Sequence, residues 1–285
     1  MQDHIIAFSI FTLVVFVINK LYAKITVKNV DPIALTILGN LFAAIVFIPF
    51  VYKDIIGFNF GYEQLIIIIF GGFCWTITGL VSNISVKNAD LSLREPMLAL
   101  RVIGVSLLAF FFLGEVFNLQ KILFTALIFF GVFIAGWRGG KNFDFQTSGS
   151  KWILFSIITM SFSVFFDKLG SNKVGVELYT WCMYFIPFVL QSVKAPKLMP
   201  EIKDILTNHR VNFIILSTSM VLTYWSQIKL YSLLPLSIAY PIVQFGSILT
   251  ILSAIIFLGE RDNLQMRVLG SVIAVLGVVL FKVLQ

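Results

Sequence analysis

The sequence predicts an all-α polytopic membrane protein in which ten transmembrane helices form two inverted five-helix repeats. Three observations support this prediction. First, 59% of the 285 residues are hydrophobic and only 12% are charged, whereas soluble domains usually carry about 25% charged residues. Second, apolar runs of about 20 residues, enough to cross a bilayer as a helix, recur along the chain. Third, the motif FLGEVFNLQ at 112–120 returns as FLGERDNLQ at 257–265.

The ten predicted spans are long apolar runs joined mostly by short connections, as expected of antiparallel neighbours. They cover about 4–22, 32–52, 63–86, 91–113, 118–137, 151–169, 175–193, 211–231, 236–258 and 264–283. The third run is rich in β-branched residues, but its length favours a helix over a strand. The connection 194–210 contains either a short interfacial helix after Pro200 or an ordinary polar loop.

Charge and motif patterns exclude several classes of function. The net charge of +7 comes from basic residues that stand singly between apolar runs, so we expect the lipid bilayer and not nucleic acid as the large partner. Cys74 and Cys182 lie in separate apolar runs without metal-ligand spacing. The sequence contains no phosphate loop, histidine-rich metal motif or nucleophile–base pair. We therefore expect that the protein binds no cofactor and is not an enzyme.

The repeat is visible when the chain is shifted by 145 residues. Thirteen of the 30 positions in 91–120 are then identical to those in 236–265, including a proline, a Gly-Glu pair and Asn-Leu-Gln. The segment FIPF also occurs twice, at 47–50 and 185–188. Low sequence complexity would produce chance identities among the many Leu and Ile residues. It would not align the proline, the Gly-Glu pair and Asn-Leu-Gln in the same register.

The repeat predicts two domains, residues 1–140 and 141–285, which divide within the Gly- and Ser-rich stretch 138–151. Each copy holds five spans. Because five is odd, the second copy must enter the membrane from the opposite face. Inverted repeats of this kind are typical of transporters.

The repeated turn has the residues of a helix–turn–helix connection. Gly114 and Gly259 can end a helix in the left-handed conformation, and Asn118 and Asn263 can cap the next helix. We expect Glu115, between these positions, to lie at the water boundary, where a charge costs little. The motif is therefore interpreted as architecture and not as a recognition site.

These features resemble the EamA-type transporters of the drug/metabolite transporter superfamily over essentially the whole chain. The resemblance rests on the two five-helix units and on the interval of 19 residues from Pro96 to Glu115 and from Pro241 to Glu260. The Trp-Gly pair common near the start of many members is absent here. The resemblance implies transport of amino acids, drugs or other metabolites, and a central cavity among helices one, three, four, six, eight and nine.

Two charged residues in the predicted fourth span are candidates for function, because ionisable groups inside a membrane usually face protein or water. Arg101 would either bind an anionic group or form a structural ion pair. Glu95 would either couple transport to protons or lie at the interface beside Arg94. The second repeat has Tyr240 in place of Glu95, so the two copies differ here.

Polar and aromatic side chains on other spans predict a substrate-binding cavity. Asn19 and Asp167 occupy equivalent ends of the first and sixth spans and are too short to reach the surface. The remaining predicted substrate-binding residues lie on the third, eighth and ninth spans: Trp75, Thr78, Trp225, Gln227, Tyr240 and Gln244. An interfacial aromatic belt is the alternative for the Trp and Tyr residues.

The leading hypothesis is a secondary transporter that moves a small polar or amphipathic metabolite, such as an amino acid, across the inner membrane by alternating access. A flippase for a lipid-linked substrate is the alternative, and a membrane enzyme or sensor is a third class. A stripe of Gly270, Ala274 and Gly277 predicts close helix packing, within the fold or in a homodimer. The positive-inside rule places both termini outside, whereas the resemblance implies cytoplasmic termini.

Overall fold

A computed structural model describes residues 2–27, 30–57, 61–88, 98, 101–115, 119–136, 148–257, 265–266, 269–270, 272–273 and 276. These residues are helical apart from short turns. The chain forms two compact units. The first contains Met1–Leu80 and Phe166–Leu233, and the second contains Val81–Phe165 and Leu234–Gln285. Each unit draws on both predicted repeats, and the repeat boundary at residue 140 stays a prediction.

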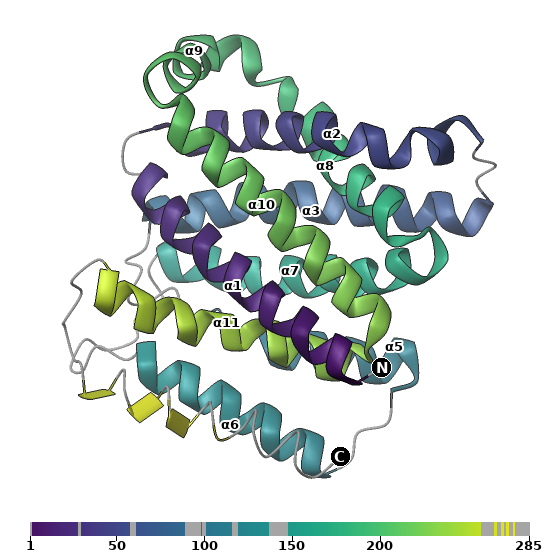
Figure 1. The fold of residues 1–285 in the computed structure, drawn as a ribbon, viewed down its shortest axis with the longest axis vertical. Coiled ribbons are helices and arrows are strands. Elements are labelled where there is room, and N and C mark those ends of the chain that lie inside the picture. Colours follow the sequence, from purple (N-terminus) through teal and green to yellow (C-terminus); the bar gives the residue numbers. More distant parts are fainter. Residues whose placement is uncertain are drawn as a thin grey trace. The chain divides into compact units, whose positions relative to one another are not determined.

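The first unit is built on two helix pairs that join distant parts of the sequence. The helix α1 lies along α10, and α2 lies along α8 (Figure 1). Its elements are α1 (Gln2–Val27), α2 (Pro32–Ile56), most of α3 (Tyr62–Asn88), the second part of α7 (Ser148–Lys173), α8 (Val176–Ser192), the 3-10 turn η1 (Ala195–Leu198), α9 (Met199–Asn208) and α10 (Arg210–Leu233).

The start of α2 shows how the sequence determines a helix boundary. The carboxylate of Asp31 accepts hydrogen bonds from the backbone N–H of Ile33 and of Ala34, at 2.9 and 2.8 Å. Pro32 occupies the first helical position, where its missing N–H costs nothing. Pro49 lies inside the same helix and Pro187 inside α8, so both copies of FIPF are helical.

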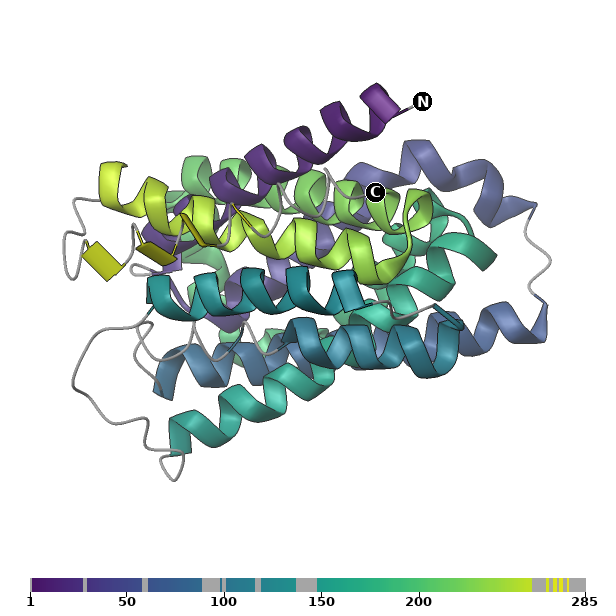
Figure 2. The same cartoon turned by 90° about the horizontal axis from the view of Figure 1, so that it is seen from below.

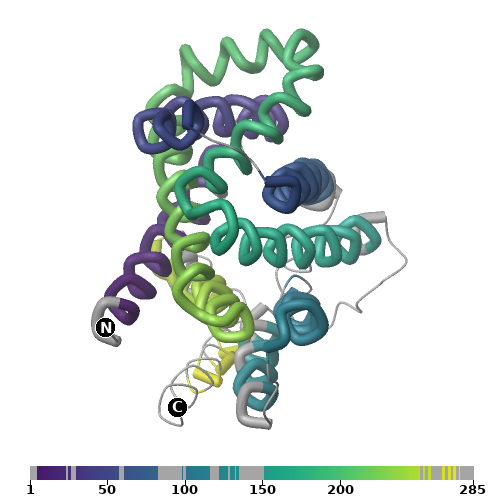
Figure 3. Tube along the Cα trace, turned by 90° about the vertical axis from the view of Figure 1, so that its right-hand side faces the viewer, coloured from purple at the N-terminus to yellow at the C-terminus, as the bar shows by residue number. Residues whose placement is uncertain are grey.

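The connection between α8 and α10 contains the helix α9, one of the two alternatives for this connection. Its buried residues Ile202 and Ile205 join an apolar cluster with Leu35 of α2 and with Phe213 and Leu216 of α10. Figure 3 shows α9 at the end of α10, beside α2.

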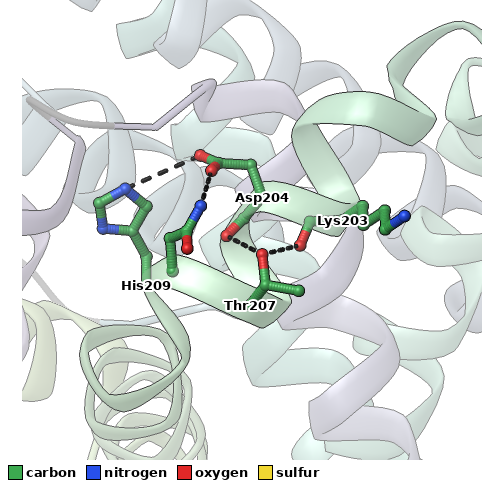
Figure 4. A network of polar contacts seen from close by, with 5 residues as sticks. Lys203, Asp204, Thr207 and His209 are labelled. Carbon is green, nitrogen blue, oxygen red and sulfur yellow. Dashed lines mark hydrogen bonds and ion pairs between the residues drawn. The ribbon is translucent and has the colours of Figure 1, made fainter.

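The other side of α9 is polar. Near its end, Asn208 Nδ2 donates to Asp204 Oδ1 at 2.6 Å, and His209 Nε2 lies 3.7 Å from Asp204 Oδ2 (Figure 4). An apolar face packed on the protein with charges opposite is the arrangement of an amphipathic surface helix, and the interfacial location of α9 stays a prediction.

The second unit contains α5 (Arg101–Leu113), α6 (Leu119–Gly136), the first part of α7 and α11 (Leu236–Phe257). Figure 2 shows α11 beside α5 and α6, and both pairs are in contact. Gly104 of α5 lies against Ser161 of α7, and a Cβ at Gly104 would overlap the Ser161 hydroxyl.

The Gly-Glu turn after α5 differs from the prediction in one respect. Gly114 has φ +65°, so the predicted left-handed helix end is confirmed. Glu115 is half-buried, and its carboxylate accepts hydrogen bonds from the backbone N–H of Leu236 (2.5 Å) and Ser237 (2.9 Å) at the start of α11. The glutamate therefore caps a helix instead of only lying at the water boundary. Asn118 and the second copy of the turn, 258–264, lie outside the described residues.

The helices support a multi-pass membrane protein. Four helical segments in the described part of the chain are long and apolar enough to cross a membrane: Ile5–Ala23, Pro32–Ile56, Tyr62–Ser82 and Lys151–Lys173. Shorter apolar helices include Arg101–Leu113 and Leu236–Thr250. The all-α class is confirmed for these residues, and ten spans in two inverted repeats stay a prediction.

Candidate functional site

The candidate site is a group of polar and aromatic side chains around Asp167 in the first unit. It begins where α3, α7 and α8 approach one another closely. A Cβ at Gly71 of α3 would lie 2.5 Å from the Tyr179 hydroxyl oxygen, and one at Gly72 would lie 2.7 Å from Ile186 Cγ2. Gly170 of α7 lies against the ring of Tyr179. These glycines let α8 pack against α3 and α7 near Asp167.

Asp167 is the centre of this group and is only 1% exposed. Its Oδ1 accepts a hydrogen bond from Trp75 Nε1 of α3 at 2.8 Å and another from the Tyr224 hydroxyl of α10 at 2.8 Å. Three helices that are far apart in the sequence therefore meet at one carboxyl oxygen.

Aromatic rings enclose the carboxyl group. The rings of Trp75 and Tyr224 pack edge to face with centroids 5.1 Å apart, and those of Tyr224 and Tyr184 do so at 5.3 Å. The Tyr184 hydroxyl donates to the Met220 carbonyl at 3.2 Å. These contacts fix the orientation of Tyr224, whose hydroxyl reaches Asp167.

Two polar atoms of the group are buried without a hydrogen-bond partner among the described residues. One is Oδ2 of Asp167, and the other is the hydroxyl of Tyr179, a fully buried residue of α8. The Tyr179 hydroxyl interacts with the Asp167 carboxyl group without forming a hydrogen bond of acceptable geometry. Buried polar atoms are nearly always satisfied, so an unsatisfied pair calls for a physical explanation.

The lysine next to Asp167 has a different partner. Lys168 Nζ donates to the Tyr231 carbonyl of α10 at 2.5 Å, and no ion pair between Asp167 and a described basic residue is present. The predicted equivalence of Asn19 with Asp167 also does not extend to their contacts. Asn19 Nδ2 donates to Ser219 Oγ at 3.3 Å and to the Leu216 carbonyl at 3.5 Å, which links α1 to α10.

The other predicted residues of the first unit have different surroundings. Trp225 is half-buried, and its ring packs edge to face on Phe8 of α1, with centroids 6.0 Å apart. Thr78 is buried, three residues after Trp75 on α3, and Gln227 is half-buried on α10. Trp75 is thus the predicted residue that the structure joins directly to Asp167.

Three predicted residues belong to the second unit. Arg101 Nε donates to the Leu98 carbonyl at 2.8 Å. Tyr240 is buried on α11, and Gln244 Nε2 of the same helix donates to Ser247 Oγ at 3.1 Å. Glu95 lies outside the described residues. The roles of these four residues in substrate binding or coupling remain predictions.

Sequence reasoning missed the tyrosines of this site. Tyr224 contacts Asp167, although the predicted cavity residues of α10 were Trp225 and Gln227. Tyr179 and Tyr184 come from the segment VELYTWCMYF, in which the sequence predicts no site residue. A usable signal existed, because a tyrosine hydroxyl in the interior of a span needs a polar partner.

Comparisons with known proteins agree with the predicted resemblance. Residues 4–137 match the model of the EamA-like transporter family, which confirms the resemblance over that range. A solved structure described as "Crystal structure of protein" has a TM-score of 0.72 and 12% identity, covering 98% of this chain and 97% of that one. At this identity the likeness concerns the fold alone. No curated protein matches the chain.

Proposed function

We propose that this protein, whose residues 4–137 match the EamA-like transporter family, is a secondary transporter for a small polar or amphipathic metabolite. An amino acid or a similar compound suits the mixture of aromatic rings and a carboxyl group around Asp167. The proposed location is the inner membrane, and the proposed mechanism is alternating access.

The observation that carries this proposal is the burial of Asp167 among Trp75, Tyr179 and Tyr224, on a helix that is long and apolar enough to cross a membrane. Ionisable residues within spans are rare and usually mark substrate or ion pathways. Structural packing alone would be served more cheaply by apolar residues. The inverted repeat predicted from the sequence supports alternating access, because two halves that exchange conformations exchange inward and outward openings.

The direct test is counterflow in proteoliposomes that contain the purified full-length chain. Vesicles loaded with an unlabelled mixture of the common amino acids are diluted into a trace of the same mixture in labelled form. The proposal expects transient accumulation of label above that in protein-free liposomes loaded in the same way. A headgroup-labelled lipid in parallel vesicles tests the flippase alternative. Label that stays at the level of protein-free liposomes, together with movement of the lipid probe across the bilayer, would favour the flippase.

A further inference from the structure

The buried carboxyl group of Asp167 has no positive partner among the described residues. Lys168 is directed to the Tyr231 carbonyl, and Lys173, at the end of the same helix, pairs with Glu63 at 3.1 Å. An isolated buried carboxylate is so costly that the group normally takes up a proton or binds a cation.

The titratable groups that face Asp167 from neighbouring helices do not supply this charge. They are Cys74 of α3, Tyr179 and Tyr184 of α8, and Tyr224 of α10. Each of these side chains is neutral or becomes negative when it loses a proton. The described side chains therefore leave the neutralisation of Asp167 to a proton on the carboxyl group itself or to a bound cation.

The two oxygens of the carboxyl group have different surroundings. Oδ1 accepts two hydrogen bonds, from Trp75 Nε1 and from the Tyr224 hydroxyl, so it suits the carbonyl oxygen of a protonated acid. Oδ2 has no hydrogen-bond partner, and the Tyr179 hydroxyl that interacts with the group has none either. A hydroxyl can donate to a carboxylate or accept from a carboxylic acid. The site can therefore hold either protonation state with the donors to Oδ1 unchanged.

We propose that Oδ2 of Asp167 binds and releases the proton that couples transport to the proton gradient, an inference that rests on the proposed function. A proton from one side of the membrane forms the O–H bond on Oδ2 and neutralises the carboxylate. When the site opens to the other side, this bond breaks, the proton passes to water, and the carboxylate is restored. Trp75, Tyr179 and Tyr224 are positioning residues for this exchange.

Infrared difference spectroscopy tests proton binding without any knowledge of the substrate. The purified chain in lipid is compared between acidic and alkaline buffer, and the C=O stretch of a protonated carboxyl group is followed. We expect a band that is lost in Asp167→Asn and retained in the matched control Glu63→Gln, which removes an exposed, ion-paired acid. A band of unchanged size in Asp167→Asn would overturn the proposal.

A second variant keeps this test decisive if Asp167→Asn does not fold. Tyr179→Phe removes the hydroxyl that interacts with the carboxyl group but leaves the ring in place. The proposal expects the carboxyl band to change frequency in Tyr179→Phe. An identical band in this variant and in the wild type would contradict the assignment of the proton to Oδ2 of Asp167, beside this hydroxyl.

Transport measurements separate coupling from substrate binding. For one proton per substrate, wild-type proteoliposomes should accumulate the labelled amino-acid mixture about tenfold for each unit of pH gradient. Asp167→Asn has no carboxyl oxygen that can take up a proton, so any counterflow that it retains should be independent of the pH gradient, and accumulation driven by the gradient should be lost. The control Glu63→Gln should accumulate the label like the wild type. Accumulation at the wild-type level by a folded Asp167→Asn would overturn the proposal. A wild type without counterflow would instead contradict the proposed function, and the infrared test would still decide proton binding.

Discussion

The carboxylate of Glu115 caps the helix that begins at Leu236, 121 residues further along the chain. Its two oxygens accept the backbone N–H groups of Leu236 and Ser237, while its own N–H donates to the Ala109 carbonyl at 3.3 Å. One residue therefore closes α5 and stabilises the start of α11. The negative charge also interacts favourably with the positive end of the helix dipole.

This cap predicts that Glu115→Ala destabilises the protein. Loss of a helix N-cap costs about 0.5–2 kcal/mol, so the apparent melting temperature of the purified protein in detergent should fall. Glu63→Ala is the matched control, because it removes an exposed ion pair worth about 0–1 kcal/mol. Equal melting temperatures for the Glu115→Ala and Glu63→Ala variants would show that the cap contributes little.

The hydrogen bond from Trp75 to Asp167 predicts a specific loss of transport. Trp75→Phe keeps an aromatic ring but removes the Nε1 donor, so Asp167 Oδ1 retains only Tyr224. The missing bond costs about 1 kcal/mol and leaves the carboxyl group free to reorient. We expect slower counterflow by Trp75→Phe in proteoliposomes.

A second tryptophan of the same unit provides the control for that experiment. Trp181 Nε1 donates to the Ala44 carbonyl at 3.1 Å, away from Asp167. Trp181→Phe therefore removes a comparable bond and should transport at close to the wild-type rate. Equal losses in both variants would mean that the effect is one of general stability.

The contact between α3, α7 and α8 predicts that removal of the Tyr179 hydroxyl oxygen restores stability to one glycine variant and not to another. Gly71→Ala would place a Cβ against the Tyr179 hydroxyl, and Gly170→Ala would place one against its ring. Each change should destabilise by about 1–3 kcal/mol through overpacking. Tyr179→Phe should partly restore the melting temperature of Gly71→Ala but not that of Gly170→Ala.

The control for this set is Gly61→Ala, where the added Cβ would meet only Gln64 Oε1 at an ordinary 3.5 Å. Its melting temperature should stay near that of the wild type. Rescue of both glycine variants by Tyr179→Phe, or of neither, would be inconsistent with the observed packing.

The sequence alone was sufficient for features that depend on neighbouring residues. Apolar runs located the described helices, Pro200 gave α9 as one of two alternatives, and Gly114 indicated a left-handed helix end. These features follow from hydrophobic periodicity and local backbone preference. The proton-coupling role predicted for Glu95 depends instead on its surroundings in the folded protein. It stays untested because that residue lies outside the described part of the chain.

Contacts between distant helices could not be predicted in the same way. Tyr224, Trp225, Gln227 and Lys229 lie within six positions of α10, and periodicity does not say which of them faces α7. The structure directs Tyr224 to Asp167 and Trp225 to Phe8 of α1. The cap on α11 was missed for the same reason, because nothing near Glu115 in the sequence indicates Leu236 as its partner.

Counterflow by Asp167→Ala is the most direct measurement of whether transport depends on the group around Asp167. Alanine removes both carboxyl oxygens, so Trp75 and Tyr224 lose their common acceptor. With a melting temperature and elution profile that show a folded protein, we expect at least about a tenfold lower initial rate than the wild type, equivalent to about 1.4 kcal/mol. Counterflow at the wild-type rate by folded Asp167→Ala would contradict this dependence.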